Sequence, residues 1–232
     1  MRGVAIIPAR GGSKRLPRKN IADFHGKPII AYSIAAAVES GCFEQVVVST
    51  EDAEIAEIAS RFGARIDMRD PSLATDAATV DQVCLDFLDR ERQAGNDWKR
   101  MACLYATAPL RNSLDVAAVV GLLKEGECDF AMGVSAYQIQ PNLALKFLPD
   151  GELLPMWPEL IELRADKLPP LRASNGTTYA VECDAFKKYK TFYGPGLRGY
   201  DMPRIRGVDI DTADDLDYAL WLARRIWGDG CG

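Results

Sequence analysis

Histidine is almost absent from this chain. Among its 232 residues there is one histidine, His25. A Ser-His-Asp or Cys-His mechanism could therefore depend only on His25, and a metal site built from several histidines is excluded. Any enzyme chemistry must come from lysine, arginine, carboxylate, hydroxyl or backbone groups, or from a metal held by oxygen ligands.

Long hydrophobic runs and paired cysteines are also missing. No apolar run approaches the roughly 20 residues of a membrane span, and the N-terminal apolar stretch is too short for a signal peptide. The six cysteines form no Cys-x-x-Cys pair, and most lie inside apolar runs, as reduced core thiols do: Cys42, Cys84, Cys103, Cys128, Cys183 and Cys231. We expect a cytoplasmic protein that binds neither a membrane nor zinc.

The composition is that of an ordinary globular protein, with 48% hydrophobic and 26% charged residues, 19 glycines and 13 prolines. Disordered, collagen-like and disulfide-rich classes are excluded. At this length, one α/β domain with a single excursion would use the whole chain.

Charge is unevenly distributed. Residues 1–30 carry seven cations and one anion, a net charge of +6, so the other 202 residues carry −11 of the total of −5. A long polyanion would be repelled by most of such a protein, which argues against nucleic-acid binding. A compact anion such as a nucleoside triphosphate fits better, and the plain alternative is a solvated charged face.

Apolar patterns alternate between strand and helix. Short continuous apolar runs predict buried strands at 4–7, 46–48, 101–105, 130–134, 177–182 and 205–210. Helical spacing predicts helices at 28–41, 51–62, 79–92, 113–124 and 212–227, the last with a cap formed by Thr212 and Asp215. This order predicts a mostly parallel sheet with helices on both faces.

The alternation stops between residues 136 and 174. This stretch contains six prolines and several leucines without a helical period. A plain loop of that length is unusual inside a domain. We expect a β-rich excursion whose apolar side chains are covered by a partner subunit.

A glycine-rich loop follows the first predicted strand. Residues 8–20 read Pro-Ala-Arg-Gly-Gly-Ser-Lys-Arg-Leu-Pro-Arg-Lys-Asn. Adjacent glycines let backbone N–H groups approach an anion, and the carboxyl end of a parallel strand is where α/β sheets bind ligands. The spacing matches neither the P-loop nor the dinucleotide fingerprint.

This loop resembles the signature loop of the acylneuraminate cytidylyltransferases, the CMP-sialic acid synthetases. Further segments resemble that family in the same order along the chain: 26–34, 49–56, 69–76, 175–179 and 208–212. The resemblance implies a single Rossmann-like, three-layer nucleotidyltransferase domain over 1–232, with residues 136–174 as a dimerisation and substrate arm. It also implies a homodimer that joins a 2-keto-3-deoxy acid sugar to CMP, using CTP and releasing pyrophosphate.

The resemblance also assigns residues to CTP. Arg10, Lys14, Lys19 and Asp211 would be catalytic, with Lys19 facing the α-phosphate, where charge grows during in-line attack. Arg69, Asp76 and Thr79 are placed at the base and ribose by resemblance alone, since Asp76 and Thr79 also suit helix caps. The full predicted CTP-binding set is Ala9, Arg10, Gly11, Gly12, Ser13, Lys14, Lys19, Asn20, Arg69, Asp76 and Thr79.

Asp209 and Asp211 are the predicted metal ligands. On a strand, residues two apart point to one face. Two such carboxylates repel each other unless a cation lies between them, and Mg²⁺ bridging phosphate oxygens would supply it. The alternative is that this Asp-x-Asp only caps the following helix.

The sugar is left open by the sequence. Tyr105 stands where sialic acid synthetases usually carry a glutamine, and residues 105–109 resemble the pseudaminic acid branch, whereas residues 174–179 are closer to the sialic form. We expect a nine-carbon acid of the sialic, pseudaminic or legionaminic type. The alternatives are an eight-carbon acid, another sugar-nucleotide pyrophosphorylase, and an inactive nucleotide-binding protein. The predicted sugar-binding residues are Tyr105, Thr107, Lys146, Arg164, Arg172, Asn175 and Thr178.

Overall fold

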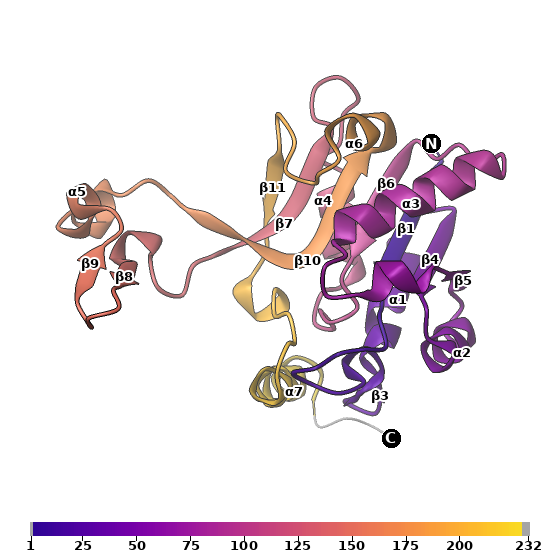
Figure 1. The fold of residues 1–232 in the computed structure, drawn as a ribbon, viewed down its shortest axis with the longest axis horizontal. Coiled ribbons are helices and arrows are strands. Elements are labelled where there is room, and N and C mark those ends of the chain that lie inside the picture. The colour runs from indigo at the N-terminus through magenta and orange to yellow at the C-terminus, as the bar shows by residue number, and fades with distance from the viewer. Residues whose placement is uncertain (1, 229–232) are drawn as a thin grey trace.

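A seven-stranded sheet forms the centre of the computed structural model, which describes residues 2–228 apart from the side chain of Ala165 (Figure 1). Its spatial order is β11-β7-β10-β6-β1-β4-β5. β10 is antiparallel to both neighbours, and the other strands run in one direction. The predicted, mostly parallel sheet is confirmed. The strands are β1 (Gly3–Pro8), β4 (Gln45–Thr50), β5 (Arg65–Met68), β6 (Arg100–Leu104), β7 (Phe130–Ala136), β10 (Arg172–Glu182) and β11 (Arg198–Asp201).

Helices cover both faces of the sheet. Successive side chains of β1 point to opposite faces, so Ile7 packs with α1 (Ile29–Glu39), α2 (Ala53–Arg61) and α4 (Ser113–Val120). Ile6 packs on the other face with α3 (Val80–Gln93) and α6 (Cys183–Tyr189). The result is the expected three-layer α/β architecture.

A third apolar cluster lies under α7 (Ala213–Trp227), which closes the end of the molecule near the hairpin of β2 (Asp23–Phe24) and β3 (Lys27–Pro28). His25 and Gly26 form the two-residue turn of this hairpin with positive φ values of 49° and 84°. The ring of Trp227 stacks on Tyr32 at 5.3 Å between centroids. The predicted cap of α7 is present, because Thr212 and Asp215 bond each other's backbone N–H groups.

The prediction of a strand over 205–210 is wrong. That segment holds a short 3₁₀ turn, η5 (Arg204–Arg206), followed by irregular chain. Val208 and Ile210 pack under α7, where Ile210 is buried. The N–H of Ile210 donates to the carbonyl of Thr107 at 2.9 Å. The strand is instead β11, whose Arg-Gly-Tyr-Asp sequence has no apolar run because it lies at the sheet edge. β5 and α6 were also not predicted.

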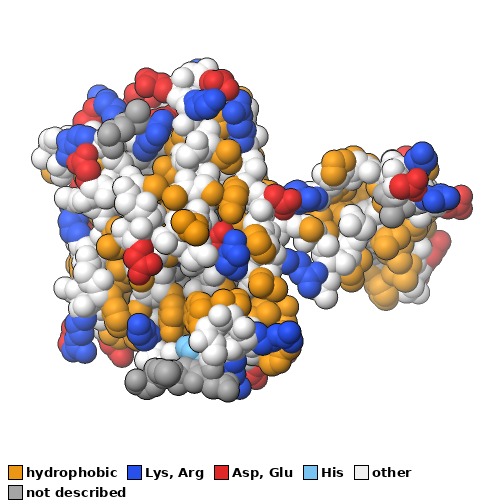
Figure 2. All heavy atoms as spheres, turned by 180° about the vertical axis from the view of Figure 1, so that it is seen from behind, with side chains coloured by type: hydrophobic (Ala, Val, Ile, Leu, Met, Phe, Trp, Pro, Cys, Tyr) orange, Lys and Arg blue, Asp and Glu red, His pale blue; other side chains and the backbone are white. Residues whose placement is uncertain are grey.

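The excursion projects from the body between β7 and β10 as an extended arm (Figure 1). It is not β-rich: it contains only the short hairpin β8 (Leu145–Phe147) and β9 (Leu153–Pro155), with α5 (Pro158–Ile161), η3 (Pro141–Leu143) and η4 (Ala165–Lys167). Residues 172–174 belong to β10 and therefore to the sheet. Hydrophobic side chains cover much of the arm surface (Figure 2), including Ile139 and Phe147, which are 72% and 73% exposed.

The described cysteines are free thiols, as predicted. Cys84, Cys103, Cys128 and Cys183 are buried and Cys42 is half-buried, whereas Cys231 lies outside the described residues. Within residues 2–228, no helix is both long and apolar enough to cross a membrane.

Candidate active site

A cavity of about 310 Å³ opens beside the carboxyl ends of β1 and β6. This is the edge at which parallel α/β sheets bind ligands. Ten of the residues predicted for the site line it: Arg10, Ser13, Lys14, Lys19, Asn20, Arg69, Asp76, Tyr105, Thr107 and Asp211. The loop after β1, the segment after β5 and the end of β6 therefore meet in one place, although they lie far apart in the sequence.

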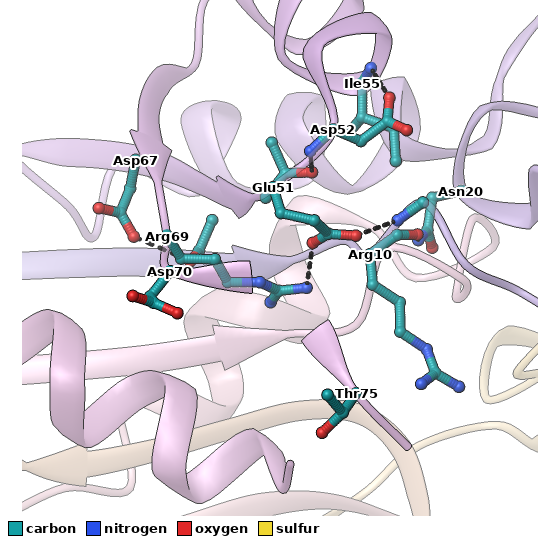
Figure 3. A network of polar contacts seen from close by, with 12 residues as sticks. Arg10, Asn20, Glu51, Asp52, Ile55, Asp67, Arg69, Asp70 and Thr75 are labelled. Atoms are coloured by element: carbon teal, nitrogen blue, oxygen red, sulfur yellow. Dashed lines mark hydrogen bonds and ion pairs between the residues drawn. The ribbon is translucent and has the colours of Figure 1, made fainter. Parts of the chain in front are cut away.

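The loop after β1 is held by Glu51 at the end of β4. One carboxylate oxygen of Glu51 accepts from the Gly11 amide at 2.7 Å, and the other accepts from Arg69 Nη2 at 2.8 Å (Figure 3). The Arg69 side chain is only 3% exposed, and its Nε is a buried donor without a partner among the described residues. Glu51 thus joins the loop to the wall of the cavity that carries Arg69, a contact that the sequence did not reveal.

Asp52 fixes the same loop from the other side. It caps α2 by accepting from the amides of Glu54 and Ile55, and its carboxylate receives Arg18 at 2.5 and 2.9 Å. The Arg18 hydrogen bond lowers the pKa of Asp52 to about 2, against the effect of burial. Arg18 therefore fixes the loop to the start of α2.

Asp76 reaches across the cavity to two loop cations. Its carboxylate accepts from Lys14 Nζ at 2.5 Å and from Arg10 Nη1 at 2.8 Å. The hydrogen bonds from Lys14 and Arg10 hold the pKa of Asp76 below its ordinary value. In Figure 3 the Arg10 side chain points away from Glu51 and toward the segment that carries Thr75.

Asp211 binds the other two loop cations. Lys19 Nζ lies 2.6 Å from one oxygen and Arg15 Nη2 lies 2.7 Å from the other. Burial acts to raise the pKa of Asp211, but the hydrogen bond and charge of Lys19, with Arg15, outweigh it and lower the pKa. The predicted neighbourhood of Lys19 and Asp211 is therefore present.

Asp209 lies beside this pair but not on a strand. Its Oδ1 accepts from the hydroxyl of Thr107, and a Cβ on Gly176 would come within 3.2 Å of its Oδ2. Burial raises the pKa of Asp209, against the effects of Thr107 and Lys19. Among residues 2–228, no cluster of three or more metal-binding side chains occurs, so a cation here would take two carboxylates and further oxygens from its ligand.

Tyr105, a predicted sugar-binding residue, begins a cluster of aromatic side chains whose other members were not predicted for the site. Tyr105 lies 5.6 Å from Tyr179, which lies 5.2 Å from Phe192 and 6.4 Å from Tyr193, centroid to centroid. Burial raises the pKa of Tyr179 to about 12. No sequence signal links Tyr179 to Tyr105, because the antiparallel pairing of β10 with β6 creates this contact.

Arg111 is a second residue that was not predicted. Its Nη1 donates to the carbonyl of Thr177 at 2.5 Å, and its Nε and Nη2 are buried without a partner among the described residues. Burial lowers its pKa to about 10. Arg111 thus ties β10 to the residue that follows β6, through the carbonyls of Thr177 and Tyr105.

The remaining predicted residues lie around the cavity or away from it. Thr79 caps α3, Ala9 is buried with its amide bonded to Ser49, and Asn175 and Thr178 lie on β10. Arg172 pairs with Asp201 at 2.8 Å beside a different cavity. Lys146 and Arg164 are exposed on the arm. This chain alone therefore does not bring the last three to the cavity.

Comparison with known proteins decides the family. The family model described as cytidylyltransferase matches residues 4–143. The pseudaminic acid cytidylyltransferase of Campylobacter jejuni is 32% identical over 96% of both chains. The chain belongs to the cytidylyltransferase family. The acylneuraminate cytidylyltransferase resemblance is confirmed with it.

Other relatives of this cytidylyltransferase carry different sugar names. The CMP-N,N'-diacetyllegionaminic acid synthase of Legionella pneumophila is 33% identical over 95% of this chain and 94% of its own. The N-acylneuraminate cytidylyltransferase of Streptococcus agalactiae is 31% identical over 95% of this chain, which spans 53% of that protein. These relatives are CMP-sugar cytidylyltransferases for three different acid sugars.

Solved structures agree with the fold of this cytidylyltransferase. The structure of CMP:2-keto-3-deoxy-manno-octonic acid synthetase complexed with CTP has a TM-score of 0.71 and 18% identity, covering 97% of this chain and 100% of that one. The 4-diphosphocytidyl-2C-methyl-D-erythritol synthase of Anaerococcus prevotii has a TM-score of 0.68 and 9% identity, covering 97% and 99%. At these identities the likeness concerns the fold alone.

The two loop glycines provide a matched test of the loop geometry. In Gly11→Ala the new Cβ would lie on the Asp52 carboxylate, whose Cγ is 3.1 Å away, whereas Gly12 has open space. Overpacking of this kind costs about 1–3 kcal/mol, so we expect Gly11→Ala to lower the melting temperature by about 2–10 °C. Gly12→Ala should leave it unchanged, and calorimetry of both variants measures this. Equal melting temperatures would contradict the contact with Asp52.

Proposed function

We propose that this protein transfers CMP from CTP to the anomeric hydroxyl of a nine-carbon 2-keto-3-deoxy acid sugar and releases pyrophosphate. The observation that carries the proposal is the cavity itself. Four cations of one loop, Arg10, Lys14, Arg15 and Lys19, line it at the ligand-binding edge of the sheet. The names of the relatives support the reaction, since each of them is a CMP-sugar enzyme.

The triphosphate end of CTP would bind to the loop. Arg10 and Lys14 supply charge, and Ser13 and Asn20 supply polar groups around the same space. Gly11 was expected to offer its amide to the triphosphate, but in the structure this amide donates to Glu51. Arg69, which lines the cavity with one unpartnered donor, would face the base.

Lys19 would act at the α-phosphate. Its side chain is 17% exposed and is oriented by Asp211. When the sugar oxygen attacks in line and pyrophosphate leaves, negative charge grows on the phosphoryl oxygens. A fixed ammonium group stabilises that charge more in the transition state than in the ground state.

The carboxylates of Asp209 and Asp211 fit Mg²⁺, since hard cations prefer oxygen ligands. Asp209 is short of cationic partners, and burial raises its pKa, so a bound cation would stabilise its charged form. When bound, Mg²⁺ would neutralise charge on the phosphates and the departing pyrophosphate. Thr107 would orient Asp209, and Lys19 would orient Asp211.

The sugar would lie at the carboxyl end of β6, beside β10, which pairs with it. Tyr105 and Thr107 follow β6, and Asn175 and Thr178 belong to β10. Tyr105 lines the cavity, and its ring offers an apolar surface to a substituent of the sugar. Three relatives of nearly equal identity act on three different acid sugars, so this chain's own substrate requires measurement.

The arm supports a homodimer. Its exposed apolar side chains would be covered by a second copy, and Lys146 and Arg164 on the arm would then come near the partner's sugar site to hold the carboxylate of the sugar. The free, mostly buried thiols of the described cysteines favour the cytoplasm as the place of work.

Pyrophosphate release tests the function. We expect release from CTP and Mg²⁺ with only one member of a panel of sialic, pseudaminic, legionaminic and eight-carbon 2-keto acids. Addition of EDTA should abolish it, because without Mg²⁺ no divalent cation offsets the negative charge of the phosphates beside the two carboxylates. Release with UTP or GTP and another sugar would favour a different pyrophosphorylase. CTP binding without release in any combination would favour an inactive nucleotide-binding protein.

Lys19→Ala should lower kcat by about 100-fold and change the Kd of CTP much less, because the charge matters most in the transition state. Lys19→Arg should recover part of the rate. Lys27→Ala removes an exposed lysine from β3 and serves as the charge-matched control. Initial rates and calorimetry give the two quantities. An equal loss of affinity with unchanged kcat would assign Lys19 to binding only.

Replacement of Phe147 tests the arm. We expect the wild-type chain to sediment at twice its own mass, and Phe147→Glu to sediment as a monomer with lower activity, because a charge cannot be buried in an apolar interface without a partner. Leu114→Glu is a matched control, because Leu114 is 75% exposed on α4. Analytical ultracentrifugation decides, and a monomeric wild type would remove the proposed interface.

A further inference from the structure

We propose that Asp76 is a competing anion that occupies Arg10 and Lys14 while no triphosphate is bound, and that it returns to them to displace pyrophosphate after transfer. This inference rests on the proposed function, since it requires that the loop binds CTP. It assigns Asp76 a role opposite to the ribose contact that family resemblance predicted.

The geometry places one carboxylate against two cations. Asp76 Oδ1 accepts from Arg10 Nη1 at 2.8 Å, and Oδ2 accepts from Lys14 Nζ at 2.5 Å. Both carboxylate oxygens therefore accept a hydrogen bond, each from a different side chain of the loop after β1. All three side chains line the cavity.

The contact is of a kind that an anion can displace. The side chains of Asp76, Arg10 and Lys14 are 55%, 38% and 79% exposed, and ion pairs that are this exposed are weak. The neighbouring pair of Glu51 and Arg69 differs, because those side chains are 18% and 3% exposed. Glu51 is thus suited to a fixed structural contact, and Asp76 to a reversible one.

Asp76 and a triphosphate would compete for the same donors. Guanidinium and ammonium groups donate hydrogen bonds and accept none, so each N–H that binds Asp76 is unavailable to a phosphate oxygen. CTP carries several negative charges in place of one, and therefore displaces the carboxylate. Pyrophosphate remains on the same cations after transfer, and the tethered carboxylate then competes with it locally.

The two roles of Asp76 predict changes of opposite sign. If Asp76 competes with phosphates, Asp76→Asn should tighten the binding of CTP and of pyrophosphate by about three- to ten-fold, the range for two exposed ion pairs, and hardly affect CMP. If Asp76 binds the ribose, the same variant should weaken CTP and CMP alike and leave pyrophosphate unchanged.

Calorimetric titrations of the full chain with CTP, CMP and inorganic pyrophosphate in the presence of Mg²⁺ test this. Asp76→Glu keeps the carboxylate and should restore most of the wild-type affinities. Asp97→Asn is the control, because Asp97 is 56% exposed and pairs with Lys99 at 2.7 Å, away from the cavity lining. In turnover, Asp76→Asn should also lower the inhibition constant of pyrophosphate by the same factor.

The outcomes separate the two proposals. If Asp76→Asn binds both CTP and pyrophosphate more tightly than the wild type, and Asp97→Asn does not, the role of Asp76 as a competing anion is supported. If the wild type binds CTP and Asp76→Asn binds CTP and pyrophosphate equally well or more weakly, this role is overturned and the proposed function is left intact. A wild-type chain that binds neither CTP nor pyrophosphate overturns both.

Discussion

The carboxylate of Glu51 is the contact on which the arrangement of the site depends. It follows β4 directly and links the loop after β1 to the segment after β5, through the amide of Gly11 and the guanidinium of Arg69. Asp52, the next residue, then fixes the loop to α2 through Arg18. Because a parallel sheet brings the ends of β1, β4 and β5 to one edge, two consecutive acidic residues suffice to position the loop.

The same principle explains how an acidic protein accommodates a strongly basic segment. The loop cations form ion pairs with carboxylates from three separate parts of the chain: Asp52 after β4, Asp76 after β5, and Asp211 before α7. Only the first of these is combined with a helix cap. The other two hold side chains that line the cavity, so the basic character of the segment can be turned toward a ligand.

The sequence predicted what depends on local pattern and on residue type. Apolar runs identified the buried strands, Thr212 and Asp215 identified the start of α7, and the loop after β1 identified the edge where the cavity lies. Lys19 and Asp211 are 192 positions apart; the sequence assigned both to one site but did not predict the ion pair between them.

What failed depends on tertiary packing. The strand predicted at 205–210 was wrong because Val208 and Ile210 are apolar in order to pack under α7, not in order to lie in the sheet. β11 was overlooked because a strand at the sheet edge needs no apolar run. The contacts of Glu51, Arg111 and Phe192 have no sequence signal at all, since each depends on which strands are neighbours. The roles of the individual site residues remain predictions to be tested by the variants.

The path of β10 has a mechanical consequence. Arg172 pairs with Ala136 at the base of the arm, and the same two strands continue into the sheet. The arm is therefore joined to the sheet by the paired strands β7 and β10. The register of this pair is interrupted only between Ser174 and Tyr179, where Gly176 adopts a positive φ of 68° beside Asp209. Paired strands bend most easily at such an irregularity. A displacement of the arm would therefore change the backbone first next to Asp209.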